Sequence, residues 1–282
     1  MYISSSSFSY RLLSGLLFCL LIACRNEADS NNQYVNKWIG TGLEGRVAPV
    51  ASVPFGMMQI GADTRPYGAG YHYDDPSILG FSHLHKSGGG CADFLDILFM
   101  PLPLNSGMAD EELYSKQYQA VLSHKDEKAE PGYYSVGLYD KQLTVELTAS
   151  RRCGLQRYTY ASEGEIPVIV DLKYGSESAC TIQSEHDVDT VYASAFEWVD
   201  PYTVRGYRCS NGWTPGQQVY FYSTFSSPIK ECVLYVDDRR LEGMTSAEGT
   251  NIKALLTFES NTGELEVRTA LSSVDTQGAA KN

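Results

Sequence analysis

Ten short segments between Tyr133 and Ser272 have the composition of β-strands, many of them with alternating apolar and polar residues, and this pattern constrains the fold more than any other feature of the chain. In one of them, Leu143, Val145 and Leu147 would point to one side of a strand and the polar residues between them to the other. A period of two is typical of strands with one buried face. The ten predicted strands are Tyr133–Leu138, Leu143–Ser150, Gly154–Tyr160, Pro167–Leu172, Val191–Val199, Tyr202–Ser210, Gln218–Phe225, Cys232–Val236, Ile252–Glu259 and Leu265–Ser272.

So many strands at short spacing, with almost no helical pattern, indicate an all-β protein, built as a large antiparallel β-sandwich with few short helices. The earlier part of the chain is richer in glycine and proline. There we predict a strand at Val53–Ile60 that is entered from a proline turn, and a buried strand at Ile97–Met100 that is stopped by Pro101 and Pro103. Glu111–Gln119 is the one short helix we expect in this part.

The charge and composition of the chain exclude some classes of partner. The net charge is −12, so neither nucleic acid nor an anionic membrane surface is expected to bind. The 282 residues are 43% hydrophobic, which is enough for a large core. Twenty tyrosines suit β-sheet packing, and some could instead stack against sugar rings, which present apolar C–H faces.

The first residues have the pattern of an export signal. Leu12–Ala23 is apolar but short for a membrane span. Its last residues and the next one, Leu21-Ile22-Ala23-Cys24, resemble the cleavage motif of bacterial lipoproteins. We therefore expect residues 1–23 to be a lipoprotein signal peptide, Cys24 to be acylated, and the polar residues 24–33 to form a tether. The alternative is an ordinary secretory signal with a chance cysteine. The protein is expected to be exported and lipid-anchored in a bacterial membrane, facing the periplasm or the cell surface.

Five cysteines follow Cys24, and their spacing matches no zinc motif. Most are expected to be buried as small hydrophobic residues. Because an exported chain can form disulfides, one pair is possible among Cys153, Cys180, Cys209 and Cys232, and the sequence does not choose it.

The segment Gly80–Pro101 concentrates residues that can carry chemistry. In an extended chain His83 and His85 would point to the same side, and the three glycines at 88–90 allow the backbone to approach another group closely. Three interpretations are open: a metal site, buried structural histidines, or a polar loop whose imidazoles and carboxylates bind sugar hydroxyls. We favour the sugar-binding loop.

Two acids in this segment, Asp93 and Asp96, raise the possibility of a glycosidase acid pair. Inverting glycosidases need carboxyl groups about 6.5–9.5 Å apart, one of them with a raised pKa. Two acids three residues apart at a loop-to-strand junction do not establish such a pair, so we assign no catalytic residue.

A second motif is Gly206–Trp213. Asn211-Gly212 favours a tight hairpin turn, which would place Trp213 on a loop before the next strand. The indole can serve as a packing residue or as a platform for a ligand or a second domain.

Several blocks of the chain, in this order, resemble the N-terminal domain of glycoside hydrolase family 92, the exo-α-mannosidases. They are Tyr34–Gly42, Val53–Met57, Ala69–Tyr73, Gly80–His85, Ser87–Asp93, Asp96–Pro101, the Trp213 segment and Leu271–Asp275. The resemblance extends from about Tyr34 to the C-terminus. Each block is short, but the ordered set is specific.

The resemblance implies a supersandwich-like N-terminal domain at residues 34–275, followed at 276–282 by the start of a linker to a catalytic α/α-barrel. In the family, the active site lies between the two domains: calcium and the catalytic acid and base come mainly from the barrel, and the N-terminal domain contributes sugar-contacting loops. The enzymes release terminal α-linked mannose with inversion. For this chain it implies no catalytic residue, no metal site and no cofactor, with calcium only in the barrel. We expect the chain to be truncated before that barrel.

The implied partners are α-mannoside glycans and a separately encoded barrel, with the membrane reached only through the lipid anchor. The alternatives are a stand-alone glycan-binding surface lipoprotein or the remnant of a truncated gene. The candidate sugar-contacting residues are Tyr71, His83, His85, Gly88, Gly90, Cys91, Asp93 and Trp213. The chain departs from the family pattern at Val50, at Tyr67 and at Leu84 between the histidines, which could alter the sugar subsite.

Overall fold

The structure is a computed structural model that describes residues 31–89, 93–106, 118–175 and 189–282. A short 3-10 helix, η1 (Asn31–Tyr34), belongs to an N-terminal unit that ends at Asn36. The second unit, Lys37–Asn282, contains every strand described below.

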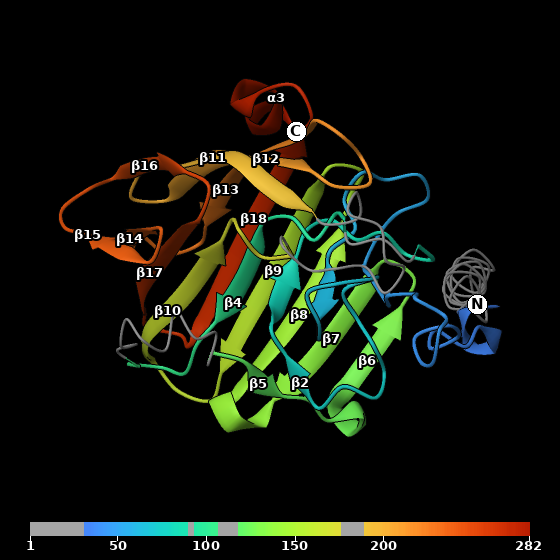
Figure 1. Ribbon diagram of the computed structural model, residues 1–282. Coiled ribbons are helices and arrows are strands. Elements are labelled where there is room, and N and C mark those ends of the chain that lie inside the picture. The colour runs from blue at the N-terminus through green and yellow to red at the C-terminus, as the bar shows by residue number, and fades with distance from the viewer. Residues whose placement is uncertain (1–30, 90–92, 107–117, 176–188) are drawn as a thin grey trace, which may run out of the picture. The chain divides into compact units, whose positions relative to one another are not determined.

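Two large antiparallel sheets make up this second unit (Figure 1). The seven-stranded sheet has the order β1 (Gly61–Asp63), β3 (Gly80–Ser82), β4 (Leu98–Pro101), β10 (Gly164–Asp171), β17 (Ile252–Ser260), β14 (Ile229–Val236) and β15 (Arg239–Leu241). The nine-stranded sheet has the order β16 (Ser246–Gly249), β11 (Thr190–Asp200), β12 (Thr203–Asn211), β13 (Gln217–Phe225), β18 (Glu264–Ser272), β9 (Cys153–Tyr160), β8 (Leu143–Ala149), β7 (Tyr133–Leu138) and β6 (Glu127–Glu130).

The remaining elements are small. Strands β2 (Ser77–Ile78) and β5 (Ala120–Val121) form a two-stranded sheet. The helices of this unit in the described residues are η2 (His124–Asp126), η3 (Tyr139–Lys141) and α3 (Thr276–Lys281). No helix in the described ranges is long and apolar enough to cross a membrane.

The predicted fold class is confirmed: the protein is all-β, with antiparallel sheets packed as a sandwich. All ten predicted segments are strands, with ends that shift by three residues at most. Alternation succeeded because it reports burial directly. In β8 the apolar residues Leu143, Val145 and Leu147 are buried and their polar neighbours are more exposed.

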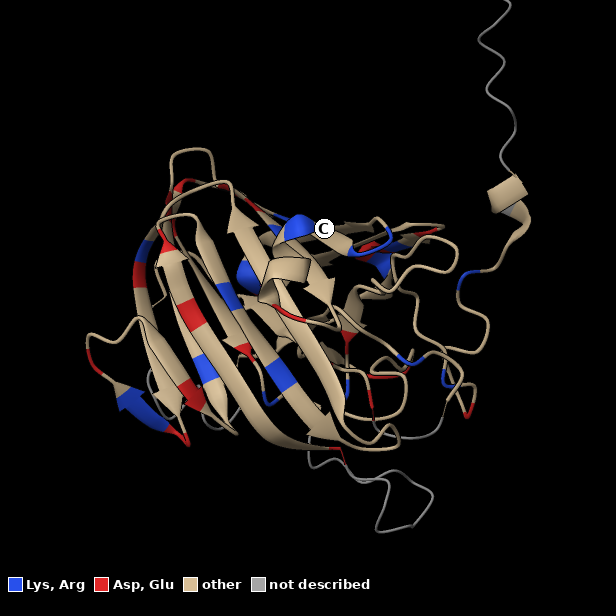
Figure 2. Ribbon diagram, turned by 90° about the horizontal axis from the view of Figure 1, so that it is seen from above, with Lys and Arg blue, Asp and Glu red and all other residues tan. Residues whose placement is uncertain are grey.

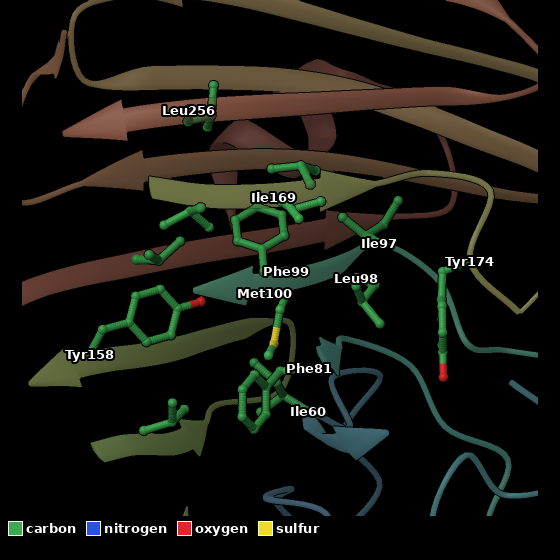
Figure 3. Close-up of a cluster of buried hydrophobic side chains, with 14 of the residues drawn as sticks. Ile60, Phe81, Ile97, Leu98, Phe99, Met100, Tyr158, Ile169, Tyr174 and Leu256 are labelled. Carbon is green, nitrogen blue, oxygen red and sulfur yellow. The ribbon is translucent and has the colours of Figure 1, made fainter. Parts of the chain in front are cut away.

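The hydrophobic core lies between the two sheets, and β4 contributes to its centre (Figure 3). Phe99 and Met100 of β4 are fully buried, close to Tyr158 from β9 and Ile169 from β10. β4 begins one residue later than predicted because Ile97 has a left-handed backbone (φ 57°). Pro101 is the last residue of the strand, opposite Val168.

At Val53–Ile60 the predicted proline turn is confirmed, but the predicted strand is wrong. Val53–Gly56 is a turn, closed by a 2.9 Å hydrogen bond from Gly56 N to Val53 O, and only an isolated bridge joins Ile60 to Ala51. Pro54 at the second position and a positive φ at the third fit a type II turn. The third residue is Phe55 (φ 59°), where glycine is preferred, at a cost of about 1–2 kcal/mol.

The predicted two-residue hairpin at Asn211-Gly212 is also wrong. Asn211 still belongs to β12, and the connection to β13 is the five-residue loop 212–216. The Asn211 side chain accepts a 2.8 Å hydrogen bond from Gly216 N, and Gly216 has the positive φ (70°) that completes the turn. Most of the predicted helix at 111–119 lies outside the described residues.

The outer face of the nine-stranded sheet carries paired charges (Figure 2). Arg157 lies 3.0 Å from Glu266 on the neighbouring strand, and Arg205 lies 2.7 Å from Glu197. Helix α3 folds back over this sheet against β13 and β18, with Ala279 fully buried. Because these ion pairs are exposed to solvent, they contribute little to stability.

The cysteines in the described residues do not form disulfides: Cys153, Cys209 and Cys232 are free thiols. Burial raises the pKa of each of them, and that of Cys232 reaches about 12. Cys24, Cys91 and Cys180 lie outside the described residues.

Truncation of Phe99 to alanine should test how much of the stability comes from the centre of the core. Because the ring is fully buried, we expect Phe99→Ala to lower the free energy of unfolding by about 3–5 kcal/mol. Chemical denaturation of both proteins measures this. The matched control is Val121→Ala, at a side chain that is 61% exposed, which should change stability by less than about 0.5 kcal/mol.

Candidate functional site

A cavity of about 750 Å³ opens beside the start of β13, and we call it the β13 pocket. Its wall comes from three loops, from β13 and from the residue that follows β18. The lining residues are Met57, Gln59, Leu84, His85, Lys86, Ser87, Phe94, Gln217, Gln218, Val219 and Ser273. The lining combines apolar side chains with glutamine amides, hydroxyls, the His85 imidazole and one lysine, and none of its described residues carries a carboxylate.

His83 lies behind this pocket and is fully buried. Its Nδ1 donates to the backbone oxygen of Ile97 (2.6 Å), and its Nε2 accepts from the Gln156 amide (3.1 Å). The Gln156 oxygen in turn accepts from the Tyr158 hydroxyl (2.8 Å). This network holds His83 as one neutral tautomer, since a second ring proton would face the amide NH2 group. Burial lowers the pKa of His83 to about 4.

His85 is also held from inside the fold. Its Nδ1 donates to the backbone oxygen of Gln59 (2.8 Å), and its Nε2 lies 3.3 Å from Ser82 Oγ and from Asp63 Oδ1. The chain bends at His83, so the segment is not extended, and the expectation that both rings point to one side of a strand does not apply. Both rings fix the loop that supplies Leu84 and Lys86 to the pocket.

Asp93 and Asp96 are also buried, next to the pocket residues Phe94 and Gln217. The Asp93 carboxylate accepts hydrogen bonds from Thr214 N (2.9 Å) and Phe94 N (3.1 Å), and burial raises its pKa. Asp96 is fully buried, pairs with the Arg208 guanidinium and accepts from the Gln217 amide (2.6 Å). Both carboxylates already accept hydrogen bonds from other groups of the protein. This arrangement does not favour their use as an acid pair that acts on a substrate.

Arg208 is the centre of this cluster. Its guanidinium is fully buried and also pairs with Asp189, so one cation serves two carboxylates. Burial raises the pKa of Asp96, and the charge of Arg208 opposes that rise. Four buried polar atoms around it have no hydrogen-bond partner in the described structure: Arg208 Nε, Asp189 Oδ1, Ser210 Oγ and Gln217 Oε1. Polar groups of this kind commonly bind ordered water.

The other candidate residues differ in exposure: Trp213 and Gly88 are exposed, and Tyr71 is buried. Trp213 lies on the 212–216 loop and is 58% exposed, with the Lys86 ammonium 3.6 Å from the centre of its ring. Gly88 is exposed and donates from its backbone to Arg46 O (2.6 Å). Tyr71 is buried, and its hydroxyl donates to Glu127 (3.0 Å). Gly90 and Cys91 lie outside the described residues.

No group of three or more histidine, cysteine or acidic side chains suited to a metal ion occurs among the residues that the structure describes.

Sequence comparison matches residues 34–272 to the glycosyl hydrolase family 92 N-terminal domain. The chain belongs to glycosyl hydrolase family 92. This family 92 domain is 30% identical, over 174 residues, to an uncharacterized secreted glycosidase of Arthroderma benhamiae. That match covers 58% of this chain and 22% of the relative.

Solved structures of the family have the same fold. A family 92 α-mannosidase of Bacteroides thetaiotaomicron, solved in complex with mannoimidazole, is 31% identical, with a TM-score of 0.77. The similarity covers 90% of this chain and 34% of that chain. An inverting mannosidase of the same organism is 25% identical, with a TM-score of 0.72, over 91% of this chain and 33% of that one. The family 92 domain therefore spans about a third of the length of these solved relatives.

Sequence reasoning missed Lys86, Arg208 and the glutamines of the pocket. One signal was available for Arg208. In β12 the residues that face the core are Val204, Gly206, Arg208 and Ser210, so a charged residue occupies an inward position of the alternation. An arginine there must have buried acidic partners, because an unpaired buried charge is very costly.

The buried imidazole of His83 should make stability depend on pH. Its pKa is about 4 in the folded protein and about 6.5 when unfolded, so the unfolded chain takes up the proton first as the pH falls. His83 should therefore stabilise the fold above pH 6.5, and this contribution should be lost between pH 6.5 and pH 4. The difference between the folded and unfolded pKa values corresponds to about 3 kcal/mol in the free energy of unfolding. Denaturation curves across this range measure it, with His83→Gln compared with the wild type at each pH. If both proteins lose stability in parallel, this account of His83 is wrong.

Proposed function

We propose that this domain contributes the sugar-contacting wall of an α-mannosidase-like active site, and that a second domain completes that site. The observation that carries the proposal is the β13 pocket, a cavity of mixed polar and apolar lining in a fold shared with mannosidases. The solved relative in complex with mannoimidazole supports the choice of an α-mannoside as the ligand.

The lining suits a pyranose ring. Gln59 and Gln218 offer amide donors and acceptors for hydroxyl groups, and Ser87 and Ser273 offer hydroxyls. Met57, Leu84, Phe94 and Val219 provide apolar surface for the C–H faces of a sugar. Trp213 can extend that surface at the rim, beside Lys86.

The histidines and Asp93 then act as positioning residues. His83 and His85 hold the 84–87 loop in place, and Asp93 holds the 212–216 loop through Thr214 N. Gly88 directly follows Lys86 and Ser87, which line the pocket. We propose no direct role for Tyr71, because its hydroxyl is used within the fold.

Glycoside hydrolysis with inversion needs two carboxyl groups on either side of the scissile bond. Since the pocket lining contains no carboxylate, the acid and the base would come from the second domain, as would the calcium ion that the resemblance implies. The role of this domain is then to bind and orient the sugar and to exclude water. A stand-alone glycan-binding lipoprotein would use the same pocket without hydrolysis.

Titration with methyl α-mannoside and with α-linked mannobiose tests the sugar-binding role. For one shallow pocket we expect a Kd of about 1 mM, equivalent to about −4 kcal/mol. Trp213→Ala should weaken binding about two- to tenfold through loss of stacking, and Gln218→Ala about fivefold through loss of a hydrogen bond. Isothermal titration calorimetry measures both. Tyr139→Ala, at a remote tyrosine that is 68% exposed, is the matched control, and no binding to either mannoside would contradict the proposal.

We also propose that the protein is exported and anchored by a lipid on Cys24. The support is the Leu21-Ile22-Ala23-Cys24 motif, together with the secreted relative. Residues 1–30 lie outside the described structure. In bacteria supplied with an alkyne fatty acid, the wild-type protein should carry the label and Cys24→Ser should not. Cys19→Ser, inside the signal, should keep the label, and an unlabelled wild-type protein would refute the anchor.

A further inference from the structure

A second cavity, of about 200 Å³, lies at the end of the sandwich away from the β13 pocket, and we call it the Lys141 pocket. Its wall comes from residues after β4, from η3 and from the turn between β9 and β10. The β13 pocket lies beside the end of β18, whereas β18 begins opposite Thr159, next to Tyr160 in the wall of the Lys141 pocket. Because a strand of nine residues spans about 27 Å, the two pockets are separate sites.

Lys141 is the unusual residue of this cavity. Its side chain is 8% exposed, although a lysine ammonium is normally kept in water. Among the described residues, the one carboxylate within ion-pair distance is that of Asp140, at 3.9 Å, and no hydrogen bond of the ammonium occurs there. Burial lowers the pKa of Lys141, and the charge of Asp140 opposes that change. A buried cation without a close counter-ion is unfavourable, and an anion bound beside it would offset the cost.

Other groups in the wall can donate hydrogen bonds to the same ligand. Asn105 Oδ1 accepts from Glu165 N (2.9 Å), so the Nδ2 group of Asn105 remains to donate. Gln142 and Ser162 add an amide and a hydroxyl, and neither side chain has a hydrogen-bond partner in the part of the chain that the structure describes. The wall thus offers one ammonium and several neutral donors to the oxygens of an anion.

We propose that the Lys141 pocket binds the carboxylate group of a small organic acid, with the carboxylate oxygens on Lys141 Nζ and Asn105 Nδ2. A single negative charge suits the cavity better than the two charges of a phosphate, because Asp140 also lines it and would repel the second. Part of the wall is apolar and suits the carbon atoms of an organic acid: it is formed by Pro103, Leu104 and Ala161. The inference uses no residue of the β13 pocket and does not depend on the proposed function.

Calorimetric titration of the whole chain with D-glucuronate tests this site. D-glucose is the matched neutral sugar, because it carries a hydroxymethyl group in place of the carboxylate. We expect glucuronate to bind, and glucose to bind at least tenfold more weakly. Lys141→Met should abolish glucuronate binding, since it keeps the length of the side chain and removes the charge. Asn105→Asp should weaken binding at least tenfold, since it keeps the acceptor for Glu165 N and replaces the donor with a negative charge.

The matched control for these variants is Lys128→Met, at a lysine on β6 whose side chain is 62% exposed. It changes the net charge by the same amount as Lys141→Met and should bind glucuronate like the wild type. Thermal unfolding separates binding from folding. Lys141→Met should keep or raise the Tm of the free protein because it removes a buried charge. Glucuronate should raise the Tm of the wild type and leave that of Lys141→Met unchanged.

Several results would overturn the proposal. They are a wild-type chain that does not bind glucuronate, glucose that binds as tightly as glucuronate, and a Lys141→Met variant that binds like the wild type. A fall in the Tm of free Lys141→Met would show that the ammonium is already stabilised within the chain. Tighter binding of inorganic phosphate would contradict the choice of a carboxylate. Glucuronate binding that is lost in Trp213→Ala but kept in Lys141→Met would assign the ligand to the β13 pocket. Mannoside titration tests the proposed function separately, so either proposal can fail alone.

Discussion

The buried guanidinium of Arg208 is the interaction on which the arrangement of the site depends. It projects inward from β12 in the nine-stranded sheet and pairs with Asp96, two residues before β4 of the seven-stranded sheet. It therefore links the two layers at the end where the loops meet. A charge this deep is tolerated only because Asp96 and Asp189 face it, and truncation of Arg208 would leave two buried carboxylates without their cation.

The Arg208–Asp96 ion pair is connected to the pocket wall through a few hydrogen bonds. Asp96 holds the amide of Gln217, the first residue of β13, and the backbone oxygen of Asp96 accepts from His83 N (3.0 Å). Gln217 and the loop that follows His83 both supply the pocket wall. Buried hydrogen bonds thus fix the positions of residues in the pocket wall. Such a pocket is preorganised and need not rearrange when a ligand binds.

The sequence predicted the sheets well and the site less well, for a physical reason. Alternation such as that of Leu143, Val145 and Leu147 is a local property, and each strand reports its own buried face. The position of His83 depends on Gln156, 73 residues away, and that of Asp96 on Arg208, 112 residues away. Such contacts have no local pattern. The motif around His83 was therefore found, but the inward direction of its rings was not. The failed strand at Val53–Ile60 had the apolar composition of a strand, and the turn at Pro54 overrode it.

The three described thiols give the fold a further property. Cys153, Cys209 and Cys232 lie on different strands, and their pKa values are raised, so at neutral pH few of them are thiolates. Thiolates are the species that attack disulfides and oxidants, so these cysteines are poor partners for either. The sandwich thus has the same covalent structure at these three positions in a reducing compartment and in an oxidising one. At these positions the fold is stabilised by packing and hydrogen bonds and not by covalent links.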